Sequence, residues 1–167
     1  MRPGCHARVL FVCMGNICRS PTVEAVFRKT VAHAGLDTHI HIDSAGTGDW
    51  HVGHPPDRRA VTVARRRGYD LTALRARQVS AEDFAQFDWI LAMDRDNLRV
   101  LEAMRPDDYA GHLGLFLDFS PELALVDVPD PYGGEVGAFE LVLDLAERGS
   151  KGLLAVLQRR IHPEGKP

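Results

Sequence analysis

A cysteine and an arginine with five residues between them stand near the start of the chain. They belong to the run Cys13-Met14-Gly15-Asn16-Ile17-Cys18-Arg19-Ser20, the Cys13 loop, which follows an apolar stretch and precedes residues with the apolar spacing of a helix. Backbone N–H groups between a strand and a helix can bind an anion, and the positive end of the helix dipole points to the same place. Arg19 can donate two hydrogen bonds to phosphate oxygens, and this field favours a nucleophilic thiolate at Cys13. The loop is therefore predicted to bind a phosphate group and to attack it.

Other residues around the loop suit the same chemistry. Gly15 allows close backbone approach, and Asn16 tolerates left-handed backbone geometry. Ser20 offers a hydroxyl to the thiolate, and Pro21 suits the first turn of a helix, where no N–H is needed. A Cys-x5-Arg spacing alone also occurs by chance, and a cysteine after a strand is most often a small core residue. The combination favours a phosphate site over an inert strand–turn–helix.

Length and composition are those of one ordinary domain. The 167 residues, 45% hydrophobic and 26% charged, are predicted to form a single domain, 1–167. The net charge of −3 gives no reason to expect nucleic-acid binding. The eight histidines lack the spacing of zinc ligands, so neither a metal nor another cofactor is expected. Three cysteines are an odd, sparse set that suits a reducing compartment, and Cys5, outside the loop, is expected to be a bystander.

The N-terminal residues do not resemble a targeting segment. The apolar run that ends at Met14 is too short for a signal sequence, and no stretch reaches the length of a membrane span. A cytoplasmic protein without membrane contact is therefore expected, and export without a signal stays open.

Strand-like and helix-like segments alternate along the chain, which predicts a four-stranded parallel α/β sheet with helices on both faces. Strands are expected at residues 8–12, 39–43 (an edge strand), 89–93 and 113–119. Helices are expected at residues 21–34, 57–67, 94–104 and 137–161, with a short helix capped by Ser80. Cys13, Ser44 and Asp94 each follow a predicted strand, so they should share the edge of the sheet where ligands bind in such folds.

A second candidate for chemistry is Asp130, which stands between two prolines in Val128-Pro129-Asp130-Pro131-Tyr132. A turn-forming aspartate between prolines is usually only a turn, but beside the Cys13 loop Asp130 becomes a candidate general acid. Phenol has a pKa of about 10, so a phenolate leaves poorly unless it is protonated. Asp130 would protonate the ester oxygen and then activate water in the second step. Asp127 is a nearby competitor for this role.

Two aromatic residues and a basic helix complete the set of candidates. Trp50 and Tyr132 lie on separate loops that the fold can bring to one edge of the sheet, where they could enclose the ring of a substrate. Arginines are concentrated in one predicted helix, and they are expected to form a solvated face: Arg58, Arg59, Arg65, Arg66 and Arg67.

The chain resembles the low-molecular-weight protein tyrosine phosphatases. Their motif, V-C-x-G-N-x-C-R-S-P, matches residues 12–21 at every fixed position, and Asp130-Pro131-Tyr132 matches a second motif far downstream. Further similar stretches are Asp43-Ser44-Ala45-Gly46, Trp50-His51-Val52-Gly53, Ala76-Arg77-Gln78 and Met93-Asp94. One departure is Leu74, where relatives often place a histidine that joins a hydrogen-bond network behind the loop. That network is expected to be rebuilt around Ser20, Glu24 and Asp94.

The resemblance implies a phosphatase that hydrolyses phosphotyrosine and small aryl phosphates through a phosphocysteine intermediate. Cys13, Arg19 and Asp130 would be catalytic. The implied substrate-binding residues are Met14, Gly15, Asn16, Ile17, Cys18, Ser20, Trp50 and Tyr132. Cys18 would also be a redox partner that forms a disulfide with the nucleophile. Phosphotyrosine-containing proteins are the implied partners, a tyrosine kinase is a further candidate partner, and a monomer or weak homo-oligomer is expected.

Three other functions differ from this one in particular residues. Protein-arginine phosphatases resemble the loop closely but carry threonine at the position of Ile17. An arsenate reductase needs further cysteines downstream, and none follows Cys18. A phosphate-binding module without activity would be expected to lack the nucleophile or the acid, and this chain has both.

Overall fold

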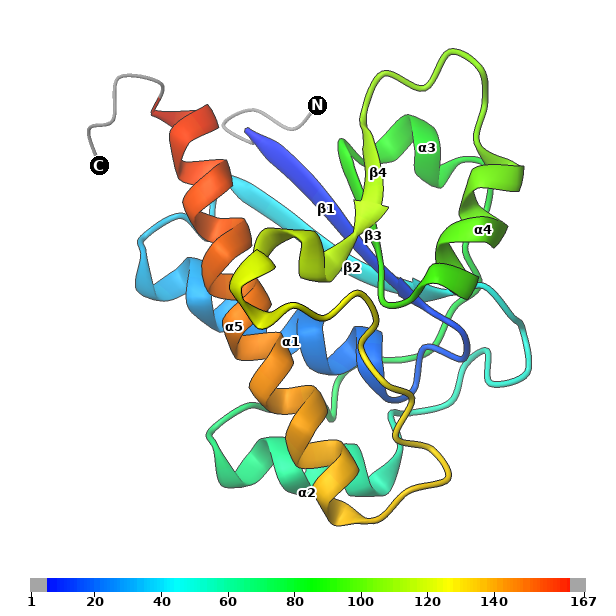
Figure 1. Ribbon diagram of the computed structural model, residues 1–167, viewed down its shortest axis with the longest axis vertical. Coiled ribbons are helices and arrows are strands. Elements are labelled where there is room, and N and C mark those ends of the chain that lie inside the picture. Colours follow the sequence, from blue (N-terminus) through cyan, green and yellow to red (C-terminus); the bar gives the residue numbers. More distant parts are fainter. Residues whose placement is uncertain (1–5, 163–167) are drawn as a thin grey trace.

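Residues 6–162 are described by the computed structural model, so Cys5 lies outside the described part (Figure 1). The strands are β1 (Ala7–Cys13), β2 (Ile40–Gly46), β3 (Trp89–Ala92) and β4 (His112–Leu115). The helices are α1 (Arg19–His33), α2 (Arg58–Arg66), α3 (Asp83–Gln86), α4 (Arg95–Met104) and α5 (Val136–Ile161), with the 3₁₀ helices η1 (Phe116–Phe119) and η2 (Pro121–Leu123).

The four strands form one parallel sheet in the order β2-β1-β3-β4, which confirms the predicted sheet and the edge position of β2. β1 is central, and its last residue, Cys13, is opposite Gly46 at the end of β2. Val12 is opposite Ala92 at the end of β3. The carboxyl ends of three strands therefore meet at one edge, and the segments that follow them lie close together.

Helices cover both faces of the sheet, as predicted, because the side chains of β1 alternate between two apolar clusters. Val9 and Phe11 belong to the larger cluster, with residues of α1 and α5, while Leu10 and Val12 belong to a second cluster with residues of α3 and α4. Figure 1 shows α1, α2 and α5 on one side of the strands and α3 and α4 on the other. The alternation follows from the two-residue period of a strand.

The first two long helices end at glycines, as the sequence indicated. Gly35 and Gly68, just beyond α1 and α2, have φ angles of 72° and 86°, which residues with a Cβ rarely adopt. Aspartates begin α2 and α4. The Asp57 carboxylate accepts the Arg59 N–H at 2.8 Å at the start of α2, and the Asp94 carboxylate accepts the Asn97 N–H at 2.7 Å at the start of α4.

Two local predictions are wrong. β4 ends at Leu115, where its pairing with β3 ends, and residues 116–119 form η1 instead of continuing the strand. The Phe116 ring packs against Gly149 of α5, and the Phe119 backbone carbonyl lies against Gly152. A Cβ at either glycine would clash with these atoms. Ser80 does not cap α3 through its side chain. Its N–H donates to the Asp83 carboxylate at 2.8 Å, and the helix begins three residues later.

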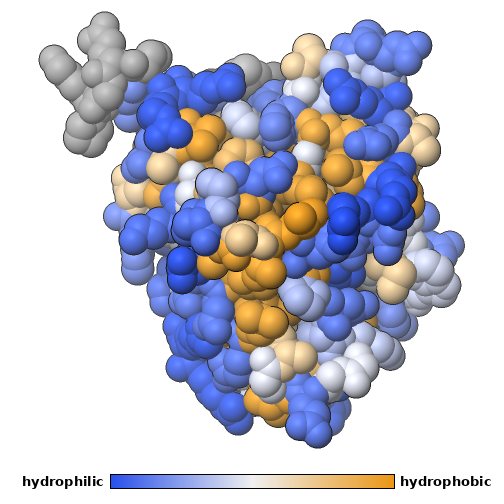
Figure 2. Space-filling model, viewed as in Figure 1, coloured by the Kyte–Doolittle hydropathy of each residue, from blue (hydrophilic) through white to orange (hydrophobic). Residues whose placement is uncertain are grey.

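Apolar residues also reach the surface. Figure 2 shows an apolar band down the middle of one face, bordered by hydrophilic residues. Large exposed apolar side chains between η2 and α5 include Leu125 and Val126. None of the helices between residues 6 and 162 combines the length and the apolar character that crossing a bilayer requires.

Candidate active site

The Cys13 loop leaves β1 at its last residue and enters α1 at Arg19. Asn16 has a φ angle of 57°, the left-handed geometry expected of it. The loop lies against the end of β2, because the Cys13 and Met14 carbonyls accept N–H groups of Thr47 and Gly48 at 2.9 and 3.0 Å. A Cβ at Gly46 would lie 2.6 Å from the Met14 carbonyl oxygen, so only glycine allows this approach.

Two polar groups contact the buried sulfur of Cys13. The Ser20 hydroxyl oxygen lies 3.0 Å from Sγ, and the Asn16 N–H donates to Sγ at 3.3 Å. Hydrogen bonds to a sulfur favour its anionic form. The start of α1 adds its positive end to the same place. The sulfur of Cys13 therefore lies among hydrogen-bond donors at the start of a helix.

A buried network of polar side chains supports the loop from behind. The Asn16 side-chain amide donates to the Ser20 and Ser44 hydroxyls at 2.7 and 3.0 Å, and the Ser44 hydroxyl donates to the Glu24 carboxylate at 2.7 Å. Burial raises the pKa of Glu24, while hydrogen bonds from Ser44 and Arg28 oppose the increase. Asn16 and Ser20 thus form the support of the loop, and their side chains do not line the cavity described below.

The network contains only two of the three residues that were predicted to form it. Ser20 and Glu24 belong to it, but Asp94 does not, because its carboxylate accepts a hydrogen bond from Arg19 at 2.6 Å. Leu74, at the position where relatives often carry histidine, packs against the larger apolar cluster. The network therefore contains Ser44 instead of the predicted Asp94.

Arg19 is buried, and its charge is held by acidic neighbours. Its guanidinium donates to the Asp94 carboxylate and to the Val128 carbonyl, at 2.6 and 3.1 Å, and lies 3.9 Å from the Asp130 carboxylate. Burial opposes the charge, but Cys13, Asp94 and Asp130 together raise the pKa of Arg19 above its ordinary value. Arg19 is therefore a fixed cation beside the Cys13 sulfur.

A cavity of about 220 Å³ opens above the loop. It is lined by nine of the predicted site residues and by His51: Cys13, Met14, Gly15, Ile17, Cys18, Arg19, Trp50, Asp130 and Tyr132. Trp50 and Tyr132 keep 67% and 54% of their surface exposed, so they stand at the mouth and are free to contact a ligand. The structure thus brings together segments that are far apart in the sequence.

His51 was missed by the sequence reasoning, although it adjoins Trp50 in a stretch similar to the family. Its ring packs on Gly15, where a Cβ would lie 2.9 Å from the imidazole carbon Cδ2. The His51 ring centre is also 6.5 Å from that of Tyr132. His51 therefore connects the Cys13 loop with the mouth of the cavity.

The two aspartates that competed for the acid role occupy different surroundings. Asp127 accepts hydrogen bonds from the backbone and side chain of Arg95 and does not line the cavity. Asp130 lines the cavity, and its side chain is 44% exposed. Its carboxylate accepts the Tyr132 N–H at 3.1 Å. The geometry therefore favours Asp130 over Asp127.

The arginines in α2 and directly after it are not simply a solvated face. Arg67 forms ion pairs with three carboxylates of α5, those of Glu140, Asp144 and Glu147. Arg59 donates to the backbone carbonyls of Tyr132 and Gly134. The sequence pattern did not indicate these contacts, because the partners of Arg59 and Arg67 lie more than 70 residues away along the chain.

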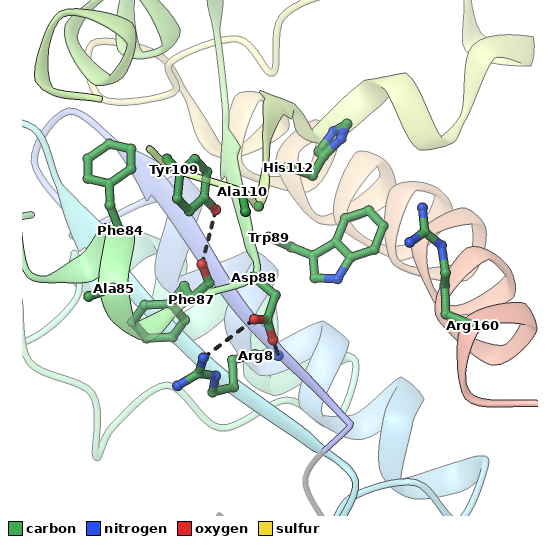
Figure 3. Close-up of a pocket in the computed structure, with 11 residues that line it drawn as sticks. Arg8, Phe84, Ala85, Phe87, Asp88, Trp89, Tyr109, Ala110, His112 and Arg160 are labelled. Carbon is green, nitrogen blue, oxygen red and sulfur yellow. Dashed lines mark hydrogen bonds and ion pairs between the residues drawn. The ribbon is translucent and has the colours of Figure 1, made fainter. Parts of the chain in front are cut away.

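A larger cavity, of about 520 Å³, lies at the opposite end of the sheet, where β1, β3 and β4 begin (Figure 3). There Arg8 is paired with Asp88, the Tyr109 hydroxyl donates to the Phe87 carbonyl, and Arg160 lies over the Trp89 ring. Among residues 6–162, no cysteine lines this cavity, and several of its polar groups bond to one another. The smaller cavity is therefore the candidate active site.

Residues 8–162 match the model of the low molecular weight phosphotyrosine protein phosphatase family. The chain belongs to this family. This phosphatase is 45% identical over 151 residues to the low molecular weight protein-tyrosine-phosphatase YfkJ of Bacillus subtilis, an alignment that covers 90% of this chain and 96% of that one. Its fold is similar to the crystal structure of a protein tyrosine phosphatase from Entamoeba histolytica, with a TM-score of 0.88 and 38% identity, covering 92% and 97% of the two chains.

The phosphatase is also similar in fold to a Drosophila arginine phosphatase. The TM-score is 0.84 at 31% identity, and the match covers 90% of this chain and 97% of that one. The fold therefore does not distinguish the two substrate classes, and side chains in the cavity must do so. Within residues 6–162 of the phosphatase, no three histidine, cysteine or acidic side chains are grouped as metal ligands would be.

Proposed function

We propose that this enzyme hydrolyses phosphotyrosine in proteins, and small aryl phosphates, through a phosphocysteine intermediate on Cys13. The observation that carries the proposal is the arrangement around one cavity. The Cys13 sulfur lies at its base with the Arg19 cation beside it, and the Asp130 carboxylate lies in its wall. These are the nucleophile, the phosphate ligand and the acid that transfer of a phosphoryl group from a phenol requires.

In the first step the phosphate group lies in the Cys13 loop, held by backbone N–H groups and by Arg19. The Cys13 thiolate attacks phosphorus, and the bond between phosphorus and the phenolic oxygen breaks. Asp130 donates its proton to that oxygen, so that a neutral phenol leaves.

In the second step Asp130, now a carboxylate, takes a proton from water as the water attacks phosphorus. The bond between sulfur and phosphorus breaks, and inorganic phosphate and the thiolate are released. Ser20, 3.0 Å from the sulfur, can donate a hydrogen bond to the departing thiolate.

The lining of the cavity favours an aryl substrate over a guanidinium. Ile17 lines the cavity and has no hydrogen-bonding side-chain group. A buried guanidinium facing it would leave donors unpaired, at a cost of about 1–3 kcal/mol for each group. A phenyl ring needs no partner there and can contact Trp50 and Tyr132, where each aromatic contact adds about 0.5–1.5 kcal/mol beyond burial.

The specificity of the wild-type enzyme tests this function. We expect kcat/KM to be far higher for a phosphotyrosine peptide than for the matched phosphoarginine peptide, and lowest for phosphoserine, whose short side chain cannot reach the base of the cavity. Ile17→Thr should narrow the difference between the first two, because the hydroxyl offers a partner to the guanidinium. A wild-type preference for phosphoarginine would reverse the assignment.

We further propose that Cys18 protects the nucleophile from oxidation. Burial, and then the charges of Asp57, Cys13 and Asp130, raise the pKa of Cys18 to about 12, so at neutral pH it is a thiol. Peroxide would therefore oxidise Cys13, giving a sulfenic acid and hydroxide. The Cys18 sulfur then attacks the sulfenic sulfur, a disulfide forms, and the oxygen leaves as water.

Peroxide followed by dithiothreitol tests this protection. Activity of the wild type should be lost and then recovered, whereas much of the loss in Cys18→Ser should be permanent as Cys13 proceeds to sulfinic acid. Disulfide closure in the wild type should accelerate with pH, because the thiolate fraction of Cys18 grows about tenfold per unit below its pKa. Equal recovery of the two proteins would remove Cys18 from this role.

The state of the two cysteines in the site bears on the compartment in which the enzyme acts. Cys13 and Cys18 are both free thiols, a state that a reducing compartment maintains. We therefore propose a cytoplasmic enzyme whose partners are phosphotyrosine-containing proteins and the kinases that produce them.

A further inference from the structure

Arg59, at the start of α2, contacts two segments of the active site. Its guanidinium donates to the Tyr132 carbonyl at 2.9 Å and to the Gly134 carbonyl at 3.3 Å. Both carbonyls belong to residues 129–135, called here the Asp130 loop. The same guanidinium lies 4.7 Å from the ring centre of Phe139, on α5, and 5.8 Å from that of Tyr132.

On its other side Arg59 is held by Asp57. The Asp57 carboxylate accepts hydrogen bonds from the Arg59 side chain at 3.2 and 3.0 Å, one on each oxygen. Desolvation opposes the charge of this carboxylate, but the hydrogen bonds and charge of Arg59 lower the pKa of Asp57 below its ordinary value. The Asp57 N–H in turn donates to the Ile17 carbonyl at 2.8 Å. A continuous chain of contacts thus runs from the Cys13 loop through Asp57 and Arg59 to the Asp130 loop.

The Asp130 loop has few other polar attachments. Its backbone hydrogen bonds are local, such as that from the Gly134 N–H to the Pro131 carbonyl at 2.8 Å. Asp130 itself lies 3.9 Å from Arg19, at the limit of an ion pair. Among residues 6–162, the hydrogen bonds that join this loop to distant parts of the chain all come from Arg59. The first half of the loop is restrained by the buried Pro131 and by Val128, whose N–H donates to the Met93 carbonyl at 2.8 Å. Because Gly133 and Gly134 add no side chains to restrain it, the second half depends on the bonds from Arg59.

We propose that Arg59 is a positioning residue that holds Asp130 over the Cys13 sulfur. This inference rests on the proposed acid role of Asp130, and Arg59 itself does not line the cavity. Arginine suits the position because its planar fork donates four hydrogen bonds, to both oxygens of a carboxylate and to two carbonyls, whereas a lysine has only three N–H donors on a single nitrogen. Without Arg59 the Asp130 loop would sample other positions, and a displacement of about 1 Å can reduce a rate by about 100-fold.

The test compares Arg59→Met with Asp130→Ala on two esters. Phenyl phosphate needs an acid, and 2,4-dinitrophenyl phosphate, with its acidic phenol, does not. We expect Arg59→Met to lower kcat/KM for phenyl phosphate by roughly 10- to 100-fold, and to change it little for the dinitrophenyl ester. In an Asp130→Ala background, Arg59→Met should have no further effect on phenyl phosphate, because the group that it positions is absent.

Two controls separate positioning from damage to the fold. Arg58→Met removes a neighbouring arginine that is exposed and has no side-chain hydrogen bond or ion pair within residues 6–162, and it should leave both rates unchanged. Inhibition by inorganic phosphate should be the same in Arg59→Met and the wild type, because the Cys13 loop is intact. Arg59→Lys, which keeps the charge without the fork, should recover only part of the loss.

The outcomes distinguish this inference from the proposed function. If Asp130→Ala shows no dependence on the leaving group, the acid role of Asp130 is wrong. If Asp130→Ala shows that dependence and Arg59→Met lowers both esters equally, or neither, Arg59 does not position the acid. Weaker phosphate inhibition in Arg59→Met would likewise contradict the proposal, because it would place the effect of Arg59 on the Cys13 loop.

Discussion

Cys13→Ser is expected to lower turnover of aryl phosphates by roughly four orders of magnitude or more, the scale of loss when an enzyme loses its nucleophile. That corresponds to about 5 kcal/mol of transition-state stabilisation. A serine hydroxyl in this place lacks the thiolate character that Ser20, the Asn16 N–H and the start of α1 favour at sulfur. The measurement is steady-state kcat/KM, together with mass spectrometry of acid-quenched wild type to detect a phosphoryl group on Cys13.

The fold of the Cys13→Ser protein should survive, because the change removes no apolar contact of consequence. Its melting temperature and its affinity for inorganic phosphate should stay close to those of the wild type, since Arg19 and the loop N–H groups remain. Wild-type activity should also persist in EDTA. Substantial activity in Cys13→Ser, or a phosphoryl group on another residue, would contradict a nucleophilic Cys13.

Asp130→Ala is expected to have the second largest effect, and the effect should depend on the leaving group. Loss of a general acid costs about 10²- to 10⁴-fold, so kcat/KM for phenyl phosphate should fall within that range. The dinitrophenyl ester should lose much less, because its phenolate leaves without a proton. Rates for a series of substituted phenyl phosphates give the slope of log rate against the pKa of the phenol, which should become steeper in the variant.

Asp127→Ala is the matched control for this prediction. Asp127 lies on the same segment, but its carboxylate is bonded to Arg95 and does not line the cavity, so its removal should leave the dependence on the leaving group unchanged. If Asp127→Ala rather than Asp130→Ala steepens the slope, the two aspartates exchange roles. Equal losses on all esters in Asp130→Ala would leave the enzyme without an assigned acid.

Most of the sheet and its helices could be predicted from the sequence because their signals are local. Alternating or continuous apolar runs mark strands, and glycines such as Gly35 and Gly68 mark helix ends within a few residues. The limit of this reasoning is visible at residues 116–119, which have the apolar character of a strand. Their shape follows instead from the end of pairing between β3 and β4 and from two glycines of α5, which admit the Phe116 ring and the Phe119 backbone.

In the candidate site too, local features could be predicted from the sequence, whereas long-range contacts could not. The proposed nucleophile, the arginine and the bend between them lie within one short segment, so residue type and spacing by themselves predicted the phosphate chemistry that we propose for the Cys13 loop. Only the tertiary structure decided what surrounds it. Arg19 contacts Asp94, 75 residues away, and Arg59 contacts Tyr132, 73 residues away. Such contacts depend on how helices and loops pack on the sheet, a long-range property that no local pattern of side chains records.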